Sequence, residues 1–206
     1  MPIGTSFTFN TSAPAIDNRV NFDHSIPMNF LVILHGAPAV GKLTIARNLS
    51  RALGGVLYDN HSSLELIKRK IPYGSPGFDD AVWSTRMAFF SNALSNQQDV
   101  IFTLAYELRK HAPRISELEQ LAKNNNVNTL PVYLYCGISE RLERVSNLDR
   151  KNIGKIHIKE ELLKFEEKNS FQDIKGCQVS INTEVSSPIK SRDRILKEIE
   201  KIRNEF

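Results

Sequence analysis

The segment from residue 29 to residue 55 constrains the fold more than any other part of the chain. Residues 30–34 form a continuous apolar run, FLVIL, which is typical of a strand buried on both faces of a parallel sheet. A loop bounded by glycines, GAPAVG, follows at residues 36–41. Apolar residues then recur at helical spacing until Gly54 and Gly55 end the pattern. The segment therefore predicts a strand, a tight loop and a helix in succession.

The rest of the chain continues this alternation. Further strands are predicted at residues 56–58, 100–104, 129–135 and 178–182. Helices are predicted at residues 63–70, 79–95, 112–124, 140–146, 159–169 and 191–203. Ser62 and Glu65 have capping-box spacing before the first of these helices, and Ser191 is the expected cap of the last. Alternating strands and helices predict an α/β fold, with a parallel sheet covered by helices on both faces.

Composition limits the number of domains and the kind of partner. A chain of 206 residues with 41% hydrophobic residues suits one α/β domain, expected over residues 28–206. Residues 1–27 are rich in small polar residues without periodicity, so a loosely ordered extension is expected there. The net charge of +4 suits an anionic ligand and disfavours nucleic acid as a partner, because no basic face with interleaved aromatic residues is visible.

The apolar runs and the cysteines bear on the protein's surroundings. The longest apolar runs are too short to span a membrane, so no membrane partner is expected. Cys136 and Cys177 form neither a disulfide framework nor a metal-ligand pattern. Their number fits a reducing interior, and the expected location is the cytoplasm.

The loop after the first strand has a phosphate-binding spacing. GAPAVGKLT contains a glycine, four spacers and then Gly41-Lys42. Backbone N–H groups in such a loop bind phosphate oxygens, helped by the positive end of the following helix, while the lysine reaches the β- and γ-phosphates. The pattern usually has a hydroxyl residue directly after the lysine, but here the hydroxyl comes one place later. The expected phosphate-binding residues are Gly36, Ala39, Val40, Gly41, Lys42, Leu43 and Thr44.

The delayed hydroxyl resembles a known kinase pattern. GKLT is similar to the GK-x-T ending of adenylate kinase and other nucleoside monophosphate kinases. The longer stretch HGAPAVGKLTIARNLSRALGG resembles the first βα unit of the P-loop kinases, particularly the shikimate-kinase-like and chloramphenicol-phosphotransferase-like ATPases. The resemblance implies a P-loop NTPase three-layer sandwich, with five parallel strands in the order 2-3-1-4-5 and a helical lid. It also implies ATP and Mg²⁺ as ligands.

The resemblance implies further roles at the end of the second strand. Asp59 matches an aspartate that lies near Mg²⁺ and the acceptor hydroxyl, so it is expected to organise the metal with Thr44 or to act as general base. His61 is expected to face the acceptor. The alternative for Asp59 is that it caps the next helix. Thr103 stands where a P-loop protein of the usual kind has a Walker B aspartate, so the metal would be held mostly by phosphates, water, Thr44 and Asp59.

Three arginines are also implied by the resemblance. Arg86 is expected to grip an anionic group of the acceptor, Arg144 to lie over adenine, and Arg150 to contact the transferred phosphate from the lid. The alternatives are a solvated helix residue for Arg86 and a solvated basic face for residues 141–159. That segment holds six basic residues against two acids. The pair Asn182-Thr183 matches the location that borders adenine.

These observations predict an ATP-dependent small-molecule kinase in which Lys42, Asp59 and Arg150 carry the chemistry. Its partners are expected to be a nucleotide and a small acceptor. A nucleoside monophosphate kinase remains an alternative. So does a nucleotide-binding ATPase or switch that has no small acceptor.

Overall fold

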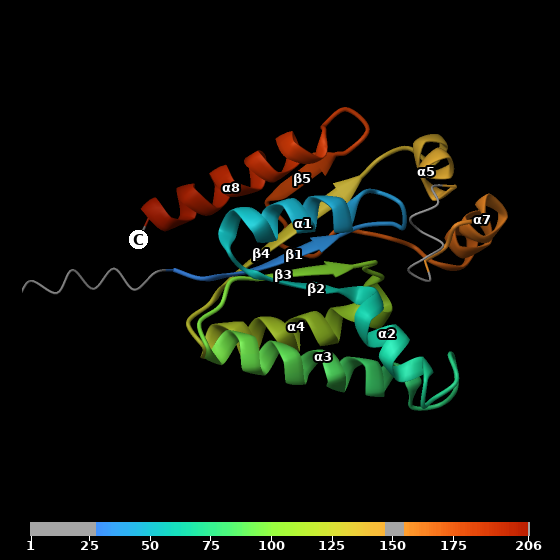
Figure 1. Ribbon diagram of the computed structural model, residues 1–206, viewed down its shortest axis with the longest axis horizontal. Helices are drawn as coiled ribbons and strands as arrows, with labels where there is room; N and C mark the ends of the chain where they lie inside the picture. The colour runs from blue at the N-terminus through green and yellow to red at the C-terminus, as the bar shows by residue number, and fades with distance from the viewer. Residues whose placement is uncertain (1–27, 147–154, 206) are drawn as a thin grey trace, which may run out of the picture.

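The computed structural model describes residues 28–146 and 155–205. Within them, five strands form one sheet in the order β2-β3-β1-β4-β5, and all four pairings are parallel (Figure 1). The strands are β1 (Phe30–His35), β2 (Val56–Asp59), β3 (Val100–Leu104), β4 (Asn128–Tyr135) and β5 (Val179–Asn182). The strand order predicted from the resemblance is confirmed.

Helices cover both faces of the sheet, as predicted. Helices α1 and α8 lie on one face and α3 and α4 on the other, while α2, α5 and α7 lie near the carboxyl ends of the strands (Figure 1). The bounds are α1 (Lys42–Leu53), α2 (Asn60–Lys68), α3 (Phe78–Ser95), α4 (Leu108–Asn124), α5 (Ile138–Val145), α7 (Lys159–Lys168) and α8 (Pro188–Asn204). The result is a three-layer α/β sandwich.

The central strand β1 is buried over its whole length, because each of its faces packs against a helical layer. Phe30, Val32 and Leu34 belong to the core shared with α1 and α8. Leu31 and Ile33 belong to the core shared with α3 and α4. Each such side chain contributes roughly 1.5–3 kcal/mol through burial. An apolar run without alternation is what two packed faces require.

Two predicted helix starts were wrong because a polar first turn carries no apolar periodicity. Helix α2 begins at Asn60, so Ser62 lies inside the helix and does not cap it. Helix α8 is capped by Ser187, whose Oγ accepts from the Lys190 N–H at 3.3 Å, and Pro188 occupies the first turn. Ser191, the predicted cap, is instead buried within α8 and donates to Ser186 Oγ.

Helix α4 also begins earlier than predicted, at Leu108, and contains Pro113. Pro113 is the sixth residue of α4, so the helix continues through it without one backbone N–H donor.

Several sequence expectations fall outside the described residues. They include the extension at residues 1–27 and Arg150. No helix in the described ranges combines the length and apolarity needed to cross a membrane.

Gly36 joins β1 to the following loop at a close approach to β4. Its φ is 138°, and a Cβ at this position would overlap the Leu134 carbonyl oxygen. Gly54, the C-cap of α1, also has a positive φ of 67°, but a Cβ there would meet no atom within 4 Å. A side chain at Gly54 would therefore suffer backbone strain alone, whereas a side chain at Gly36 would also overlap the backbone of β4.

We predict that Gly36→Ala lowers the free energy of unfolding by clearly more than Gly54→Ala. The Gly54 variant should lose about 1 kcal/mol from strain alone. Urea titration of both variants beside the unchanged protein measures the difference, and equal losses would contradict the close approach of Gly36 to β4.

Candidate active site

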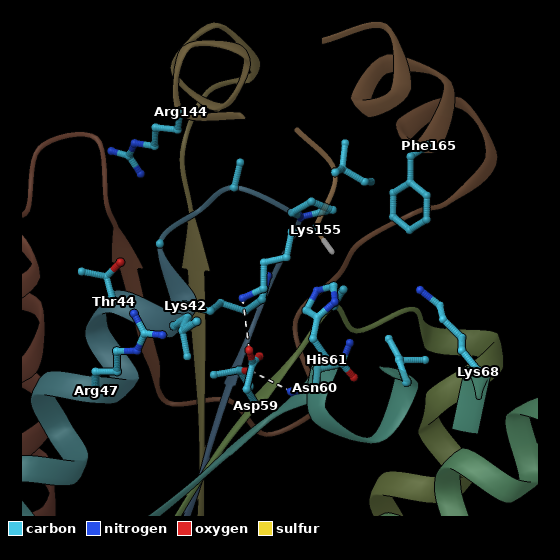
Figure 2. A pocket seen from close by; sticks show the side chains of 18 of the residues that line it. Lys42, Thr44, Arg47, Asp59, Asn60, His61, Lys68, Arg144, Lys155 and Phe165 are labelled. Carbon is cyan, nitrogen blue, oxygen red and sulfur yellow. Dashed lines mark hydrogen bonds and ion pairs between the residues drawn. The ribbon is translucent and has the colours of Figure 1, made fainter. Parts of the chain in front are cut away.

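A pocket of about 400 Å³ opens at the carboxyl ends of the strands. This edge of a parallel sheet is where ligands of open α/β folds bind. The glycine loop, the junction of β2 and α2, the end of β3, and residues from α5 and α7 all contribute to the wall (Figure 2). The lining residues include Ala39, Gly41, Lys42, Leu43, Thr44, Arg47, Asp59, Asn60, His61, Thr103, Arg144 and Lys155.

The glycine loop has the backbone geometry of an anion cradle. Ala39 has a φ of 66° and Gly41 a φ of 91°, both in the left-handed region. Gly41 is the N-cap of α1 and provides no side-chain cap. Because the first N–H groups of a helix have no partner within the helix, this end of α1 is suited to an anion.

Lys42 begins helix α1 and its ammonium group turns back over the loop. Nζ donates to the carbonyl oxygens of Gly36 at 2.7 Å and Ala37 at 2.6 Å. Of the other predicted loop residues, Leu43 and Thr44 line the pocket. Val40 is almost fully buried in the core under the loop, and neither it nor Gly36 is a lining residue. Gly36 and Val40 therefore shape the loop from beneath.

Asp59 is held by groups from two other parts of the chain. Thr103 Oγ1 donates to Asp59 Oδ1 at 2.9 Å, because β2 and β3 pair these residues directly. Lys155 Nζ lies 3.3 Å from Asp59 Oδ2 (Figure 2). Although Asp59 is the N-cap residue of α2, its side chain makes no capping hydrogen bond. The alternative interpretation, in which the side chain of Asp59 caps α2, is therefore wrong.

The carboxyl group of Asp59 is ionised at neutral pH. Burial by itself raises the pKa, but the charge of Lys155, the hydrogen bond from Thr103 and the nearby His61 together lower it below its ordinary value. Thr103 thus supports the carboxylate from the place expected of a Walker B aspartate.

His61 follows Asp59 by two residues and lines the same pocket. Burial, and then the charge of Lys155, lowers the pKa of His61 to about 4, so the imidazole is neutral at pH 7. Its Nδ1 is buried and makes no hydrogen bond to any residue in the described ranges.

Arg86 does not reach the wall of the pocket. Its side chain is buried, with 4% exposed, and it is not among the lining residues. Nη2 donates to Asn60 Oδ1 at 2.6 Å, and Nε donates to Ser63 Oγ at 2.9 Å. Arg86 therefore braces α2 from behind, through Asn60. The sequence predicted that Arg86 binds an anionic group of the acceptor or, alternatively, that it is a solvated helix residue. Its buried position behind α2 disagrees with both predictions.

Arg144 lines the pocket beside the glycine loop and is tied to two elements. Nε donates to Glu140 at 2.7 Å, and Nη2 donates to the Thr183 carbonyl oxygen at 2.7 Å. Arg144 thereby links α5 to the segment after β5, which is the location matched in the sequence to the border of adenine.

The basic segment expected over residues 141–159 is largely paired with acids where the structure describes it. Arg141 is buried and makes two hydrogen bonds to the carboxylate of Glu166, at 2.7 and 2.9 Å. Arg144 pairs with Glu140, and Lys155 with Asp59. This pairing does not match a solvated basic face.

The pocket nevertheless carries a clear excess of positive charge. Among its described lining residues, five side chains are cationic and Asp59 is the one carboxylate. The cations are Lys42, Arg47, Lys68, Arg144 and Lys155. Sequence reasoning missed Arg47 and Lys68. Arg47 follows Thr44 by three residues and so shares its helix face, which was a usable signal. For Lys68 we find no comparable signal in the sequence.

No three His, Cys, Asp or Glu side chains gather into a metal site within the residues that the structure describes. Thr44 and Asp59 are the predicted metal ligands, and both line the pocket. Mg²⁺ commonly takes only one or two protein oxygens and completes its shell with phosphates and water. These residues therefore fit a metal that arrives with a nucleotide, and do not fit a site built from protein ligands alone.

Two solved structures of kinases are similar to this chain. A gluconokinase from Sinorhizobium meliloti matches with a TM-score of 0.59 and 18% identity, over 87% of this chain and 95% of that chain. A sugar kinase from a Janibacter species matches with a TM-score of 0.59 and 14% identity, over 84% of this chain and 95% of that chain. The chain shares the fold of these two kinases. No protein-family model matches the sequence, and the search of curated proteins finds no match.

His35 makes the folded state sensitive to acid. It is fully buried at the end of β1, stacked on Tyr133 with ring centroids 5.3 Å apart. Burial, and then the charge of Lys42, lowers the pKa of His35 to about 3. Between this value and the ordinary pKa of about 6.5, the unfolded chain binds a proton that the folded chain does not. Stability is therefore lost as the pH falls below about 6.5.

We predict that His35→Phe reduces the loss of unfolding free energy between pH 6 and pH 5. The variant should remove up to about 1.4 kcal/mol per pH unit from the slope of stability against pH. Chemical denaturation at several pH values checks this slope, and identical slopes for the variant and the unchanged protein would rule out His35 as a source of acid sensitivity.

Proposed function

We propose that this protein is an ATP-dependent kinase that transfers the γ-phosphoryl group of ATP to a small-molecule acceptor. One observation carries the proposal. A loop with the backbone geometry of an anion cradle opens into a pocket whose described lining has five cationic side chains and a single hydrogen-bonded carboxylate. Phosphoryl transfer asks a protein mainly for positioning and charge neutralisation, and this lining supplies both.

The nucleotide belongs on the side of the pocket formed by α1 and α5. The loop N–H groups and Lys42 would hold the phosphates, with Thr44 and Arg47 on the same side (Figure 2). Arg144 would border the adenine, because its guanidinium group lies close to Gly41 and is anchored to Thr183. The kinase neighbours support a nucleotide as ligand.

Thr44 and Asp59 are the residues that would hold Mg²⁺, with Asp59 acting through water. The ion would supply neutralisation of charge on the phosphate oxygens. Asp59 is suited to this role because it is ionised and its carboxylate is oriented by Thr103.

In the alternative role that the sequence predicts for Asp59, its carboxylate would receive the acceptor proton. The acceptor hydroxyl oxygen forms a bond to the γ-phosphorus, and the bond from that phosphorus to the bridging oxygen of ADP breaks. The hydroxyl proton passes to the carboxylate of Asp59, and ADP leaves with the bonding electron pair. Lys155 compensates the carboxylate charge before transfer. We assign Arg150 to the transferred phosphate on the strength of the resemblance in sequence.

A nucleoside monophosphate kinase, or an ATPase without a small acceptor, would use the same nucleotide side. An ATPase should consume ATP steadily without additions, whereas a kinase should consume it quickly only with its acceptor. An ATP-consumption screen against nucleoside monophosphates, polyols, hydroxy acids and aminoglycosides separates these functions. The two free cysteines fit a cytoplasmic setting for this activity.

Lys42→Ala should abolish the thermal stabilisation of the protein by Mg-ATP. A ligand at a hundredfold excess over its Kd stabilises the folded state by roughly 2.7 kcal/mol, so the shift in the unchanged protein is measurable. Lys123→Ala serves as the control, since Lys123 is exposed on α4 and is not a lining residue. Full stabilisation of the Lys42 variant would refute the assignment of the phosphate loop.

Asp59→Asn should leave Mg-ATP binding largely intact and reduce the rate of transfer. Loss of a general base typically costs about a hundredfold or more in rate. The matched control is Asp80→Asn, because Asp80 is exposed and pairs with Arg114 away from the pocket. Single-turnover transfer measured with an acceptor found in the screen tests this, and a fully active Asp59 variant would remove this residue from the mechanism.

A further inference from the structure

The pocket continues past Asp59 into a second region with a different lining. Figure 2 shows His61, Lys68 and Phe165 on the side of Asp59 away from Thr44 and Arg47. We call this region the acceptor side. It comprises His61, Leu64, Lys68, Tyr73, Ile156 and Phe165. These residues come from α2, from the segment after it, from residues just before α7, and from α7 itself.

Two aromatic rings on the acceptor side each pack against another aromatic ring of the protein. Phe165 stacks on Phe171, with centroids 5.8 Å apart and an interplanar angle of 25°. Tyr73 meets the edge of Phe78, which is buried, with centroids 5.2 Å apart. Tyr73 remains 69% exposed although it is braced in this way. Rings that are already oriented lose little conformational freedom when a ligand packs against them.

The remaining contacts on the acceptor side are mostly apolar. Leu64 and Ile156 add aliphatic surface to the lining of the pocket. A polyhydroxylated acceptor needs a hydrogen-bond partner for each hydroxyl that it buries, since an unpaired buried hydroxyl is costly. His61 is the one uncharged polar side chain among the lining residues that define the acceptor side, apart from the Tyr73 hydroxyl. This lining suits a flat apolar group better than a sugar.

Lys68 adds one positive charge at the edge of this apolar region. Its Nζ lies 5.7 Å from the centroid of the Tyr73 ring and 2.8 Å from Glu65 Oε1. The pair with Glu65 is exposed, and exposed ion pairs contribute little stability. Lys68 can therefore exchange this partner for an anionic group of a ligand. Since His61 is neutral at pH 7, Lys68 is the charged group that distinguishes the acceptor side from a purely apolar pocket.

We propose that the acceptor is a hydroxyl-bearing anion with a flat apolar ring. The ring packs against Phe165 and Tyr73, the anionic group pairs with Lys68, and the hydroxyl points to Asp59. This proposal rests on the proposed kinase function and specifies its substrate class. Aromatic hydroxy acids have this chemistry, whereas a nucleoside 5′-monophosphate brings a polar base and a ribose with several hydroxyls.

The first experiment compares three groups of acceptors with the full-length protein and Mg-ATP. The groups are aromatic hydroxy acids, nucleoside 5′-monophosphates, and sugar acids such as gluconate. Higher kcat/KM for aromatic hydroxy acids than for the other two groups supports the proposal. Preferred turnover of sugar acids or of nucleoside 5′-monophosphates would overturn it.

Variants then test the residues with the best ring-bearing anion. Phe165→Ala and Lys68→Gln should each raise KM for that acceptor about tenfold and leave KM for ATP unchanged. The reason is that the loss of a well-packed ring or of a direct ionic contact lowers binding affinity by a factor of about ten. Leu163→Ala and Lys70→Gln are the matched controls. Both residues are exposed neighbours on or beside the same helices, and neither lines the pocket. Unchanged KM in the Phe165 and Lys68 variants would reject the acceptor side as the binding region.

Direct binding separates this proposal from the proposed function. Calorimetry of the ring-bearing anions without ATP should detect binding that Phe165→Ala weakens and Leu163→Ala does not. If that binding is seen but no acceptor drives ATP consumption, the kinase function fails while the ring-binding region stands. If sugar acids alone are phosphorylated and ring-bearing anions do not bind, the kinase function stands and this proposal is rejected.

Discussion

The parallel pairing of β1 with β3 on one side and β4 on the other is the constraint on which the rest of the structure depends. It brings the carboxyl ends of the strands to one edge of the sheet. The same register in β2 and β3 sets Asp59 opposite Thr103. The glycine loop, the carboxylate and its hydroxyl partner therefore meet without any of them being close in the sequence.

The pocket is basic, whereas the two arginines of α5 beside it are paired with acids. Arg141 of α5 is neutralised by Glu166 of α7, and this ion pair joins the two helices. Phe165 is the residue before Glu166 on α7, so the same contact helps to hold its ring in place. Arg144 is shared between Glu140 and Thr183. Both arginines thus act as structural links, and of the two it is Arg144 that lines the pocket.

The sequence predicted those features that depend on short local patterns. The buried strand β1, the loop up to Thr44 and the βα alternation follow from periodicity and glycine spacing alone. The sequence did not predict that helices begin at Asn60 and Pro188, because polar first turns resemble loops. The burial of Arg86 beneath Asn60 and the pairing of Lys155 with Asp59 depend on how distant elements pack, and one sequence holds no direct signal for such contacts.

The contact between Lys155 and Asp59 bears on the order in which the site is assembled. An ammonium group beside the carboxylate means that a divalent cation arriving alone has to displace a charge already in place. A cation that is bound to nucleotide phosphates would arrive together with anionic groups. The phosphates could then pair with Lys155 while the cation pairs with the carboxylate of Asp59. Under the proposed function, the pair would therefore disfavour bare metal ions and favour the binding of metal and nucleotide together.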